Sequence, residues 1–523
     1  MNVNIRPRPA ATPQPQAKPQ AESKTFNYNP QDPATLANDT ADISVTAANG
    51  NVETDTVKLT PKKGVFIFGQ LIALREDKNY KMNPNADGNF NFPREHDYFT
   101  GANSFSAAAA TVNKYNEVYS ELTGKKVEWS FGEEQLGVSP ETGEWPNAFY
   151  ARQMKGVHFF DVKDTSTGNS GEVASHEVGH AVLDAIRPNY LEGTGTETGA
   201  FHEAFGDVLA MLMTLGNDKA VDKIVEQTAG GDISTKPSAL SDMGEGFGKA
   251  LGMGDRGIRS SLNSFTYKDP STLPERGDEN NLGREIHDFS RLWSGAFFDV
   301  IDGIADSNRA AGMSPKEALK SAGAEGWKLL IGQMENSSAG SETTFKRMAQ
   351  NLLKGDEQFN GGQRQDLIRD VMVKRELMTG GEGLFKSELP GFSGEVVTKE
   401  MTFGTDMGVL AGVKMDTKID IPVFSALSGT APAVDDLSKQ AQDGVKHMME
   451  DNDILFLSNG EPTLEQMFKP DGDAFKAYVT TNEAGERELH RIPMAVCDFG
   501  HDHGHVHGHS HDHGHSHGEN CNH

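Results

Sequence analysis

The chain has 523 residues, of which 36% are hydrophobic and 24% are charged, so it is long enough for two or three domains with sizeable cores. Its formal net charge is -27, which argues against nucleic acid or an anionic membrane surface as a general partner. The two cysteines, Cys497 and Cys521, imply no disulfide framework, and no run of 18 apolar residues indicates a membrane span.

The N-terminal region predicts neither a classical secretory leader nor a folded segment. The stretch MNVNIRPRPAATPQPQAKPQ has no apolar core of the kind found in signal peptides, so we expect a cytoplasmic protein or one exported by a non-classical route. Seven of the 23 prolines fall within the first 33 positions. Residues 1–60 therefore predict a disordered, Pro-rich arm, and a solvated tail is favoured over a proline-rich docking site.

Regular structure is expected to begin near Gly64. The apolar stretch VFIFGQLIAL (65–74) predicts a buried strand, and residues 103–123 have helical spacing that ends at Gly124. Two more strands are predicted at VEWSF (127–131) and GVHFFDV (156–162). Apolar residues at helical spacing predict helices over 199–216, 290–304, 314–334, 345–355 and 364–377.

These elements divide the chain into parts of different character. We expect an α+β lobe over residues 61–215 and an α-helical lobe over 216–379. From residue 380 glycine and β-branched residues become frequent, which predicts an additional, separate β-rich module over 380–497. Residues 498–523 are of low complexity and predict a disordered, His-rich tail.

The stretch SHEVGH carries the clearest chemical signal. Residues four apart lie on one face of a helix, so His176 and His180 can offer imidazole nitrogens to one metal ion. Glu177 lies beside that face, where a carboxylate can act as general base on a water molecule. Since a motif this short also occurs by chance on surface helices, a third ligand is needed to support a metal site.

The surrounding sequence supports a helix and a partner helix. Asn169 could cap the first helix, Pro188 should end it, and Gly179 indicates that something approaches closely. In GAFHEAFGD (199–207), Glu203 follows His180 by 23 residues and could return as the third ligand. Asp207 shares the face of Glu203 and could accept a hydrogen bond from a ligating histidine. His202 is a rival ligand, but it points off that face and is interpreted as structural.

Taken together, these motifs resemble the thermolysin-like zinc metallopeptidases, a gluzincin family related to the fungalysins. The resemblance covers about residues 64–378, with the motifs in the family's order. It rests on HEVGHAVLD (176–184), GAFHEAFGD (199–207), NAFY (147–150), GDRGIRSSLNSFTYKDP (254–270) and EIHDFSRLWSGAFFDVI (285–301). It implies an α+β fold of two lobes, a mixed β/α N-terminal lobe and an α-helical C-terminal lobe, to which the β-rich module would be added.

The resemblance also implies a role for each matched residue. His176, His180 and Glu203 would bind one catalytic zinc ion, and Glu177 would activate the zinc-bound water that hydrolyses the peptide bond. His287 and Tyr190 would stabilise the oxyanion, and Asp207 would orient a zinc ligand. Asn147 and Ala148 would bind the backbone of a peptide or protein substrate.

Two positions depart from the family pattern. Leu282 stands where the family has an aspartate that orients its catalytic histidine, so the usual partner of His287 is missing. Glu172 fits one position of the family's calcium sites, but Thr214 replaces an expected glutamate, and calcium is therefore not predicted with the zinc.

The tail allows a different hypothesis. Ten of the 18 histidines lie within 501–523, alternating with small residues that let several imidazoles surround weakly bound transition metals. The first hypothesis is an active zinc endopeptidase. The alternatives are a metal-handling protein that uses the tail on an inactive peptidase scaffold, and a peptidase fold used for binding. Glu177 argues against both alternatives, since a scaffold needs no general base. The sequence leaves the oligomeric state open.

Overall fold

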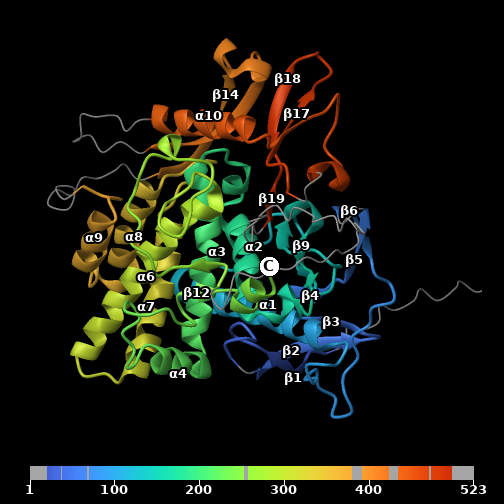
Figure 1. Cartoon of the computed structure of the whole chain (residues 1–523), viewed down its shortest axis with the longest axis vertical. Coiled ribbons are helices and arrows are strands. Elements are labelled where there is room, and N and C mark those ends of the chain that lie inside the picture. The colour runs from blue at the N-terminus through green and yellow to red at the C-terminus, as the bar shows by residue number, and fades with distance from the viewer. Residues whose placement is uncertain are drawn as a thin grey trace, which may run out of the picture.

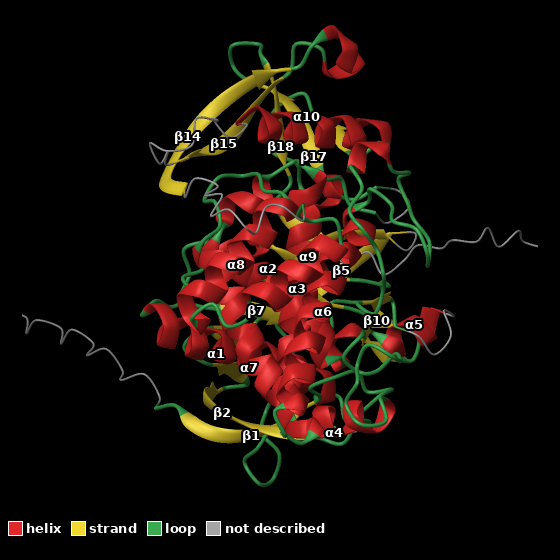
Figure 2. Ribbon diagram, turned by 90° about the vertical axis from the view of Figure 1, so that its left-hand side faces the viewer, coloured by secondary structure: helices red, strands yellow, loops and turns green. Residues whose placement is uncertain are grey.

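The computed structural model describes residues 20–36, 38–67, 70–251, 257–379, 392–422, 434–469 and 473–496. The chain is a mixed α+β protein in which helices cover one side of a large sheet (Figure 1). In Figure 2 the helices face the viewer, strands β1 and β2 lie at one end, and the C-terminal strands lie at the other. Among the described residues, no helix is long and apolar enough to cross a membrane.

The main sheet has eight strands in the order β1-β2-β3-β4-β7-β9-β8-β19. The pairs β4–β7 and β7–β9 are parallel, and the other five pairs are antiparallel. The strands, in this order, are Glu22–Tyr28, Asp39–Ala48, Asn51–Glu53, Val57–Leu59, Leu136–Ser139, Gly156–Phe159, Ala148–Ala151 and Met494–Val496. The last strand thus comes from the far end of the chain, and it occupies the edge beside β8.

The prediction of a disordered arm over 1–60 is wrong for the described residues from 20 to 60, because they form β1 to β4. Strand β2 alternates along its length, with Ile43 and Val45 buried and their neighbours exposed. Strand β2 pairs with β1, and both strands contact helix α1 (Phe99–Thr123). The alternation thus gives β2 one buried face and one exposed face. The proline-rich composition concealed this pattern, and residues 1–19 lie outside the described part.

Two other strand predictions are corrected. Residues 65–74 do not form one buried strand but contribute to an antiparallel hairpin of β5 (Lys62–Ile67) and β6 (Gln70–Glu76), whose described side chains are mostly half-buried. VEWSF (127–131) is no strand. Its Val127 amide donates to the side chain of Asn116, and the Trp129 indole donates to the Thr56 carbonyl, so these groups bond outside any sheet. Short strands β10 (Asp161–Val162) and β11 (Thr165–Ser166) pair together, as do β12 (Asp242–Met243) and β13 (Arg259–Ser260).

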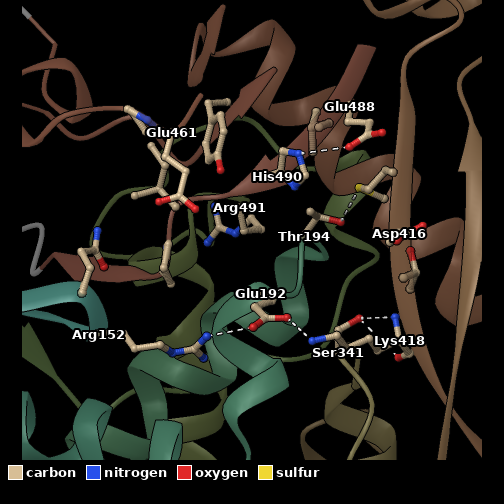
Figure 3. A pocket seen from close by; sticks show the side chains of 18 of the residues that line it. Arg152, Glu192, Thr194, Ser341, Asp416, Lys418, Glu461, Glu488, His490 and Arg491 are labelled. Atoms are coloured by element: carbon tan, nitrogen blue, oxygen red, sulfur yellow. Dashed lines mark hydrogen bonds and ion pairs between the residues drawn. The ribbon is translucent and has the colours of Figure 1, made fainter. Parts of the chain in front are cut away.

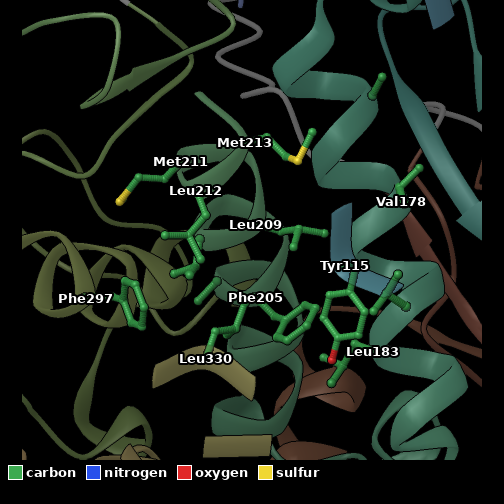
Figure 4. Packing of buried hydrophobic residues seen from close by; sticks show 14 of the residues in the cluster. Tyr115, Val178, Leu183, Phe205, Leu209, Met211, Leu212, Met213, Phe297 and Leu330 are labelled. Atoms are coloured by element: carbon green, nitrogen blue, oxygen red, sulfur yellow. The ribbon is translucent and has the colours of Figure 1, made fainter. Parts of the chain in front are cut away.

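The predicted helices are confirmed. Helix α1 ends at Gly124, which adopts a left-handed conformation with φ of 74°. The others are α2 (Gly171–Ile186), α3 (Thr196–Gly216), α4 (Asp218–Gln227), α5 (Glu245–Leu251), α6 (Ile286–Ala310), α7 (Pro315–Glu335), α8 (Phe345–Asn360) and α9 (Gln365–Lys374). Their apolar faces meet in one core, where Phe205 and Leu209 of α3 lie between α2 and the pair α6 and α7 (Figure 4).

Helices α2 and α3 approach each other through glycine. A Cβ atom on Gly179 would lie 2.8 Å from the Cα of Gly206, and a Cβ on Gly206 would lie 2.6 Å from Nδ1 of His176. Real Cβ atoms do not come so close to backbone or ring atoms, so both positions require glycine. The close approach that Gly179 indicated is therefore confirmed, and it brings the two motif-bearing helices together.

The region after residue 380, expected to be β-rich, contains a five-stranded sheet in the order β14-β15-β18-β17-β16 and helix α10 (Val434–Glu450). Its strands, in sheet order, are Phe392–Thr402, Lys414–Pro422, Arg487–Arg491, Ala477–Thr481 and Ile454–Phe456. A small core of its own includes Leu410, Val413, Val445 and Val479. We call the described residues from 392 to 493 the C-terminal module; β19 follows it directly.

Candidate metal centre

Helix α2 begins and ends where its local sequence directs. Ser170, rather than Asn169, is the N-cap, and its side chain accepts a hydrogen bond from the Val173 amide. The helix ends at Ile186, before Pro188. All residues from Gly171 to Asp184 are buried, including both histidines and both glutamates. Burying so many polar groups is costly unless each one is paired, so the helix is built around a polar site.

The structure brings His176, His180 and Glu203 together. Nε2 of His176 lies 3.0 Å from Nε2 of His180, and the Glu203 carboxylate lies 3.4 Å from the first nitrogen and 3.6 Å from the second. Each of the three residues is at most 1% exposed. This buried group of two imidazoles and one carboxylate could hold a metal ion.

A second ring of side chains fixes these three. Oδ1 of Asp207 lies 3.0 Å from Nδ1 of His176, as the sequence predicted, and the Ser294 hydroxyl donates to its other oxygen. Nδ1 of His202 lies 2.8 Å from Nδ1 of His180, so His202 contacts the ring nitrogen that faces away from the cluster. His202 is therefore the outer partner of a candidate ligand, a contact that its position off the Glu203 face did not reveal. Such partners set the tautomer and the direction of a ligating ring.

Arg259 supplies positive charge on the same side. Its guanidinium lies 3.1 Å from Asp207 and 3.6 Å from Glu203. Burial acts to raise the pKa of Asp207, but Arg259 and His176 lower it overall, so this carboxyl is ionised. Arg259 lies within the segment 254–270 that carries part of the resemblance, and no role is predicted for it from the sequence.

The charge states of His180 and Glu203 suit cation binding. That of His176 is shifted the other way, because burial and Arg259 act to lower its pKa but Asp207 and Glu203 raise it overall. Burial lowers the pKa of His180 well below its usual range, so its ring is neutral and a nitrogen lone pair is available. Burial also lowers the pKa of His202, to about 4. Burial opposes ionisation of Glu203, but His287 and His180 lower its pKa well below the usual carboxyl range. The cluster thus presents a neutral imidazole and a carboxylate to the same point.

His287 lies beside the cluster and has an orienting partner. Its Nε2 is 3.2 Å from Glu203, and its Nδ1 is 3.0 Å from Glu285, which also caps α6 by accepting from the His287 amide. Burial acts to lower the pKa of His287, but Glu203 and Glu285 raise it well above its usual value. Glu285, two residues before His287, is thus the orienting partner that was missing at Leu282, a role not predicted from the sequence.

Strand β8 begins at Ala148, directly after Asn147, and is anchored to α2. Tyr150 donates to Asp184 over 2.6 Å, and Arg152 forms an ion pair with Asp184 at 2.5 Å. Asn147 is 4% exposed, and its side chain accepts from the Ala148 amide. It lines a cavity of about 110 Å³ together with Glu203 and His287. A larger cavity of about 610 Å³ lies outside the metal cluster, between Arg152 and the C-terminal module.

Two predicted catalytic residues, Glu177 and Tyr190, are located by their burial and their helix rather than by a distance to the metal cluster. Glu177 is completely buried on α2 next to His176. Tyr190 lies in the short helix Pro188–Glu192 and lines the 110 Å³ cavity. Burial raises the pKa of its phenol, and Arg187, Ser337 and Thr343 act in the opposite direction. The strongest polar influences on the hydroxyl thus come from outside the cluster, and the oxyanion role of Tyr190 stays a prediction.

A second buried cluster lies one turn away on the same helix. Asp32, Glu172 and Glu245 place carboxylate oxygens within 4.8 Å of one another. The Gly244 amide donates to Glu172, and the Ala34 amide donates to Asp32. Burial is the main cause that raises the pKa of all three carboxyls, for Glu245 to about 7. Thr214 and Glu172 line another small cavity, so the residue that departs from the calcium pattern does lie near this region.

No protein-family model matches the chain, and no curated protein matches it in sequence. What can be said about its function therefore rests on the side chains described above.

Proposed function

We propose that the protein is a zinc-dependent endopeptidase of the thermolysin-like kind. The observation that supports this most is the buried cluster of His176, His180 and Glu203, together with the fully buried Glu177 that follows His176 in the helix. A helix that carried these residues by chance would not meet a second helix that presents a carboxylate to both imidazoles. It would also not have Asp207 and His202 on their outer nitrogens.

The donor set fits zinc. A tetrahedral centre with bonds of about 2.0–2.1 Å to nitrogen and oxygen holds its ligands roughly 3.3 Å apart. The two imidazole nitrogens are 3.0 Å apart, and the Glu203 carboxylate lies 3.4 Å from one through Oε2 and 3.6 Å from the other through Oε1. Three protein ligands of the types His, His and Glu are the set used in catalytic zinc sites, where the fourth position is open to water and substrate. Zinc would supply two effects, a lowered pKa of water and polarisation of the substrate carbonyl.

The chain's own residues supply the proton transfers and the charge stabilisation. Glu177 takes the proton of the attacking water and passes it to the leaving amine. His287 donates through Nε2 to the carbonyl oxygen as negative charge develops there. Glu285 holds the His287 ring in that direction by its contact with Nδ1. Because Glu285 also caps α6, the donor is fixed before substrate arrives.

Substrate backbone would bind along β8. A peptide added to the edge of a sheet gains main-chain hydrogen bonds that do not depend on its sequence, which suits an endopeptidase. Ala148 begins this strand, and Asn147, directly before it, lines the cavity that contains His287 and Glu203. Tyr190, on the same cavity, is the proposed second donor to the oxyanion.

The test compares metal content with cleavage. The wild-type chain and a variant that ends at Pro493, which lacks the strand beside β8, are loaded with zinc and assayed on casein and a peptide library. We expect one tightly bound zinc ion per chain at this cluster, loss of cleavage on removal of zinc by a chelator, and recovery when zinc returns. If neither chain cleaves any substrate while holding that zinc ion, the protein is a binding or metal-handling protein instead.

A matched pair of variants excludes a contaminating protease. Glu177→Ala should bind zinc and cleave nothing, whereas Glu121→Ala, on the exposed face of α1, should behave as wild type. Equal cleavage by both variants would remove Glu177 from the mechanism.

A further inference from the structure

The chain's own strand β19 occupies the edge at which substrate is expected. Met494, Ala495 and Val496 pair antiparallel with Ala151, Tyr150 and Phe149 of β8. Met494 is 8% exposed and Ala495 is 7% exposed, so the strand is seated in the protein. Adding one short extended segment to a free sheet edge is how peptide ligands bind by strand addition.

The end of β19 reaches the proposed catalytic groups. The Val496 carbonyl oxygen lies 3.0 Å from Nε2 of His287, and since a carbonyl can only accept, the histidine donates. The same nitrogen is 3.2 Å from the metal-cluster residue Glu203. The Val496 carbonyl therefore occupies the position that the proposed mechanism assigns to the carbonyl of the bond to be cut.

Ion pairs hold the C-terminal module over this site. Lys476 lies 3.7 Å from Glu285, the residue that orients His287, and Arg284 pairs with Asp451 at 2.5 Å. In the larger cavity, shown in Figure 3, Lys418 pairs with Glu192 at 2.5 Å. The module thus forms ion pairs with the body near Glu285 and near Glu192, and β19 follows the module directly.

From this placement we propose that the protein cuts its own chain between Val496 and Cys497. The proposal rests on the proposed peptidase function. Water adds its oxygen to the Val496 carbonyl carbon, its proton passes through Glu177 to the Cys497 nitrogen, and the C–N bond breaks. The products are a chain that ends in the Val496 carboxylate and a free peptide of residues 497–523, which carries ten of the 18 histidines.

Two features favour a substrate over a permanent inhibitor. The Val496 carbonyl lies on the proposed oxyanion donor, which is the position that hydrolysis of its peptide bond requires. The strand is also short, three residues, and begins directly after Pro493, which limits its pairing and lets the product leave. Until the cut, β19 excludes other peptides from β8.

The test follows the intact mass of the freshly purified, zinc-loaded full chain over time. We expect loss of residues 497–523 and recovery of a peptide that begins with Cys497, at a rate independent of protein concentration because the cut is intramolecular. Glu177→Ala should keep its full mass. Cys497→Ser, which preserves the amide N–H, should be cut like the wild type. Cys497→Pro should be cut at a rate at least about tenfold lower, because the proline ring crowds the leaving nitrogen.

The contradicting outcomes are separable. A wild-type chain that cleaves casein but keeps its full mass overturns the self-cleavage and leaves the peptidase function intact. A cut at another bond, or the same cut in Glu177→Ala, also overturns it. If the wild type and the variant ending at Pro493 both hold zinc and cleave nothing, the peptidase function itself fails, and the self-cleavage fails with it.

Discussion

Helix α2 carries two buried polar clusters one turn apart, and they differ in how their charge is balanced. His176 and His180 meet one carboxylate, Glu203, with Arg259 nearby. Glu172, four residues before His176, meets two further carboxylates, those of Asp32 and Glu245. The same helix and the same degree of burial thus give one site that mixes nitrogen and oxygen donors and one that gathers acids alone.

The difference determines what each cluster can bind. In the first, opposite charges lower the pKa of Glu203 despite burial, so it is ionised and ready to bind a metal ion. In the second, burial is the main cause of raised pKa values, so at neutral pH the carboxyls share protons. Burial alone therefore does not indicate a metal site, and the donor types and neighbouring charges decide.

The largest difference should come from replacing one residue of each cluster by alanine. His176→Ala removes a ligand, so we expect zinc to be lost and peptide cleavage to fall by about 10³-fold or more, as when a catalytic metal is removed. Glu172→Ala, one turn away, should keep one zinc ion per chain and most of the activity. Metal analysis and kcat/KM measure both. Loss of zinc in both variants would show that the clusters are not independent.

The next effect concerns the donor beside the metal cluster. Glu285→Gln keeps the shape of the side chain but removes the negative charge that faces Nδ1 of His287. We expect kcat to fall by about 10–100-fold with zinc content unchanged. KM should change little, because the substrate edge on β8 is intact. The exposed Asp366→Asn is the matched control. A change in KM alone would assign Glu285 to substrate binding instead.

A smaller effect is expected from the outer partner of His176. Asp207→Asn retains a hydrogen-bond acceptor but loses the charge shared with Arg259, so zinc affinity should fall by about tenfold. Competition with a coloured chelator measures this, and activity at saturating zinc should be nearly normal. Unchanged affinity would mean that Asp207 is not needed to hold the ring.

The smallest effect is a pH-dependent stability change in the acidic cluster. The raised pKa values, about 7 for Glu245, mean that the cluster's stabilising contribution is full below the ordinary carboxyl pKa and is lost as pH rises through the raised values. Glu172→Gln should therefore stabilise the chain by roughly 1–3 kcal/mol more at pH 8 than at pH 5, since one pKa unit is worth about 1.4 kcal/mol. Urea unfolding in calcium-free buffer measures it, with Glu121→Gln as control.

Calcium provides the contradicting outcome for this cluster. If added calcium raises the stability of the wild type at pH 8 and Glu172→Gln abolishes the increase, the carboxyls bind a cation rather than share protons.

How much could be predicted from the sequence depends on the distance between partners. His176 and His180 are joined by helix periodicity, and Glu203 by a second helix after a short turn, so the cluster was predictable. Its outer contacts were less so, because His202 reaches His180 from a neighbouring face, and Glu285 replaces an aspartate expected at Leu282. Strand β19 was not predictable, because three residues at the far end of the chain carry no signal of their partner β8.

The same reasoning explains the errors in the fold. The prolines of the first 33 positions suggested disorder up to residue 60, although the alternation in 39–48 places Ile43 and Val45 in the core. VEWSF has strand-like composition, but the Val127 amide and the Trp129 indole find partners outside any sheet. Composition predicts only the tendency of a segment to form a strand, and the hydrogen-bond and packing partners within reach decide whether the strand forms.

The central claim, that Glu177 serves a zinc-dependent peptidase, is tested most directly by one rate ratio. The variant that ends at Pro493 and the same variant with Glu177→Ala are each loaded with one zinc ion, and kcat/KM is measured on a fluorogenic peptide. The account predicts a loss of about 10²–10⁴-fold with Glu177→Ala at unchanged zinc content, as for removal of a general base. Equal rates at equal zinc content would contradict it.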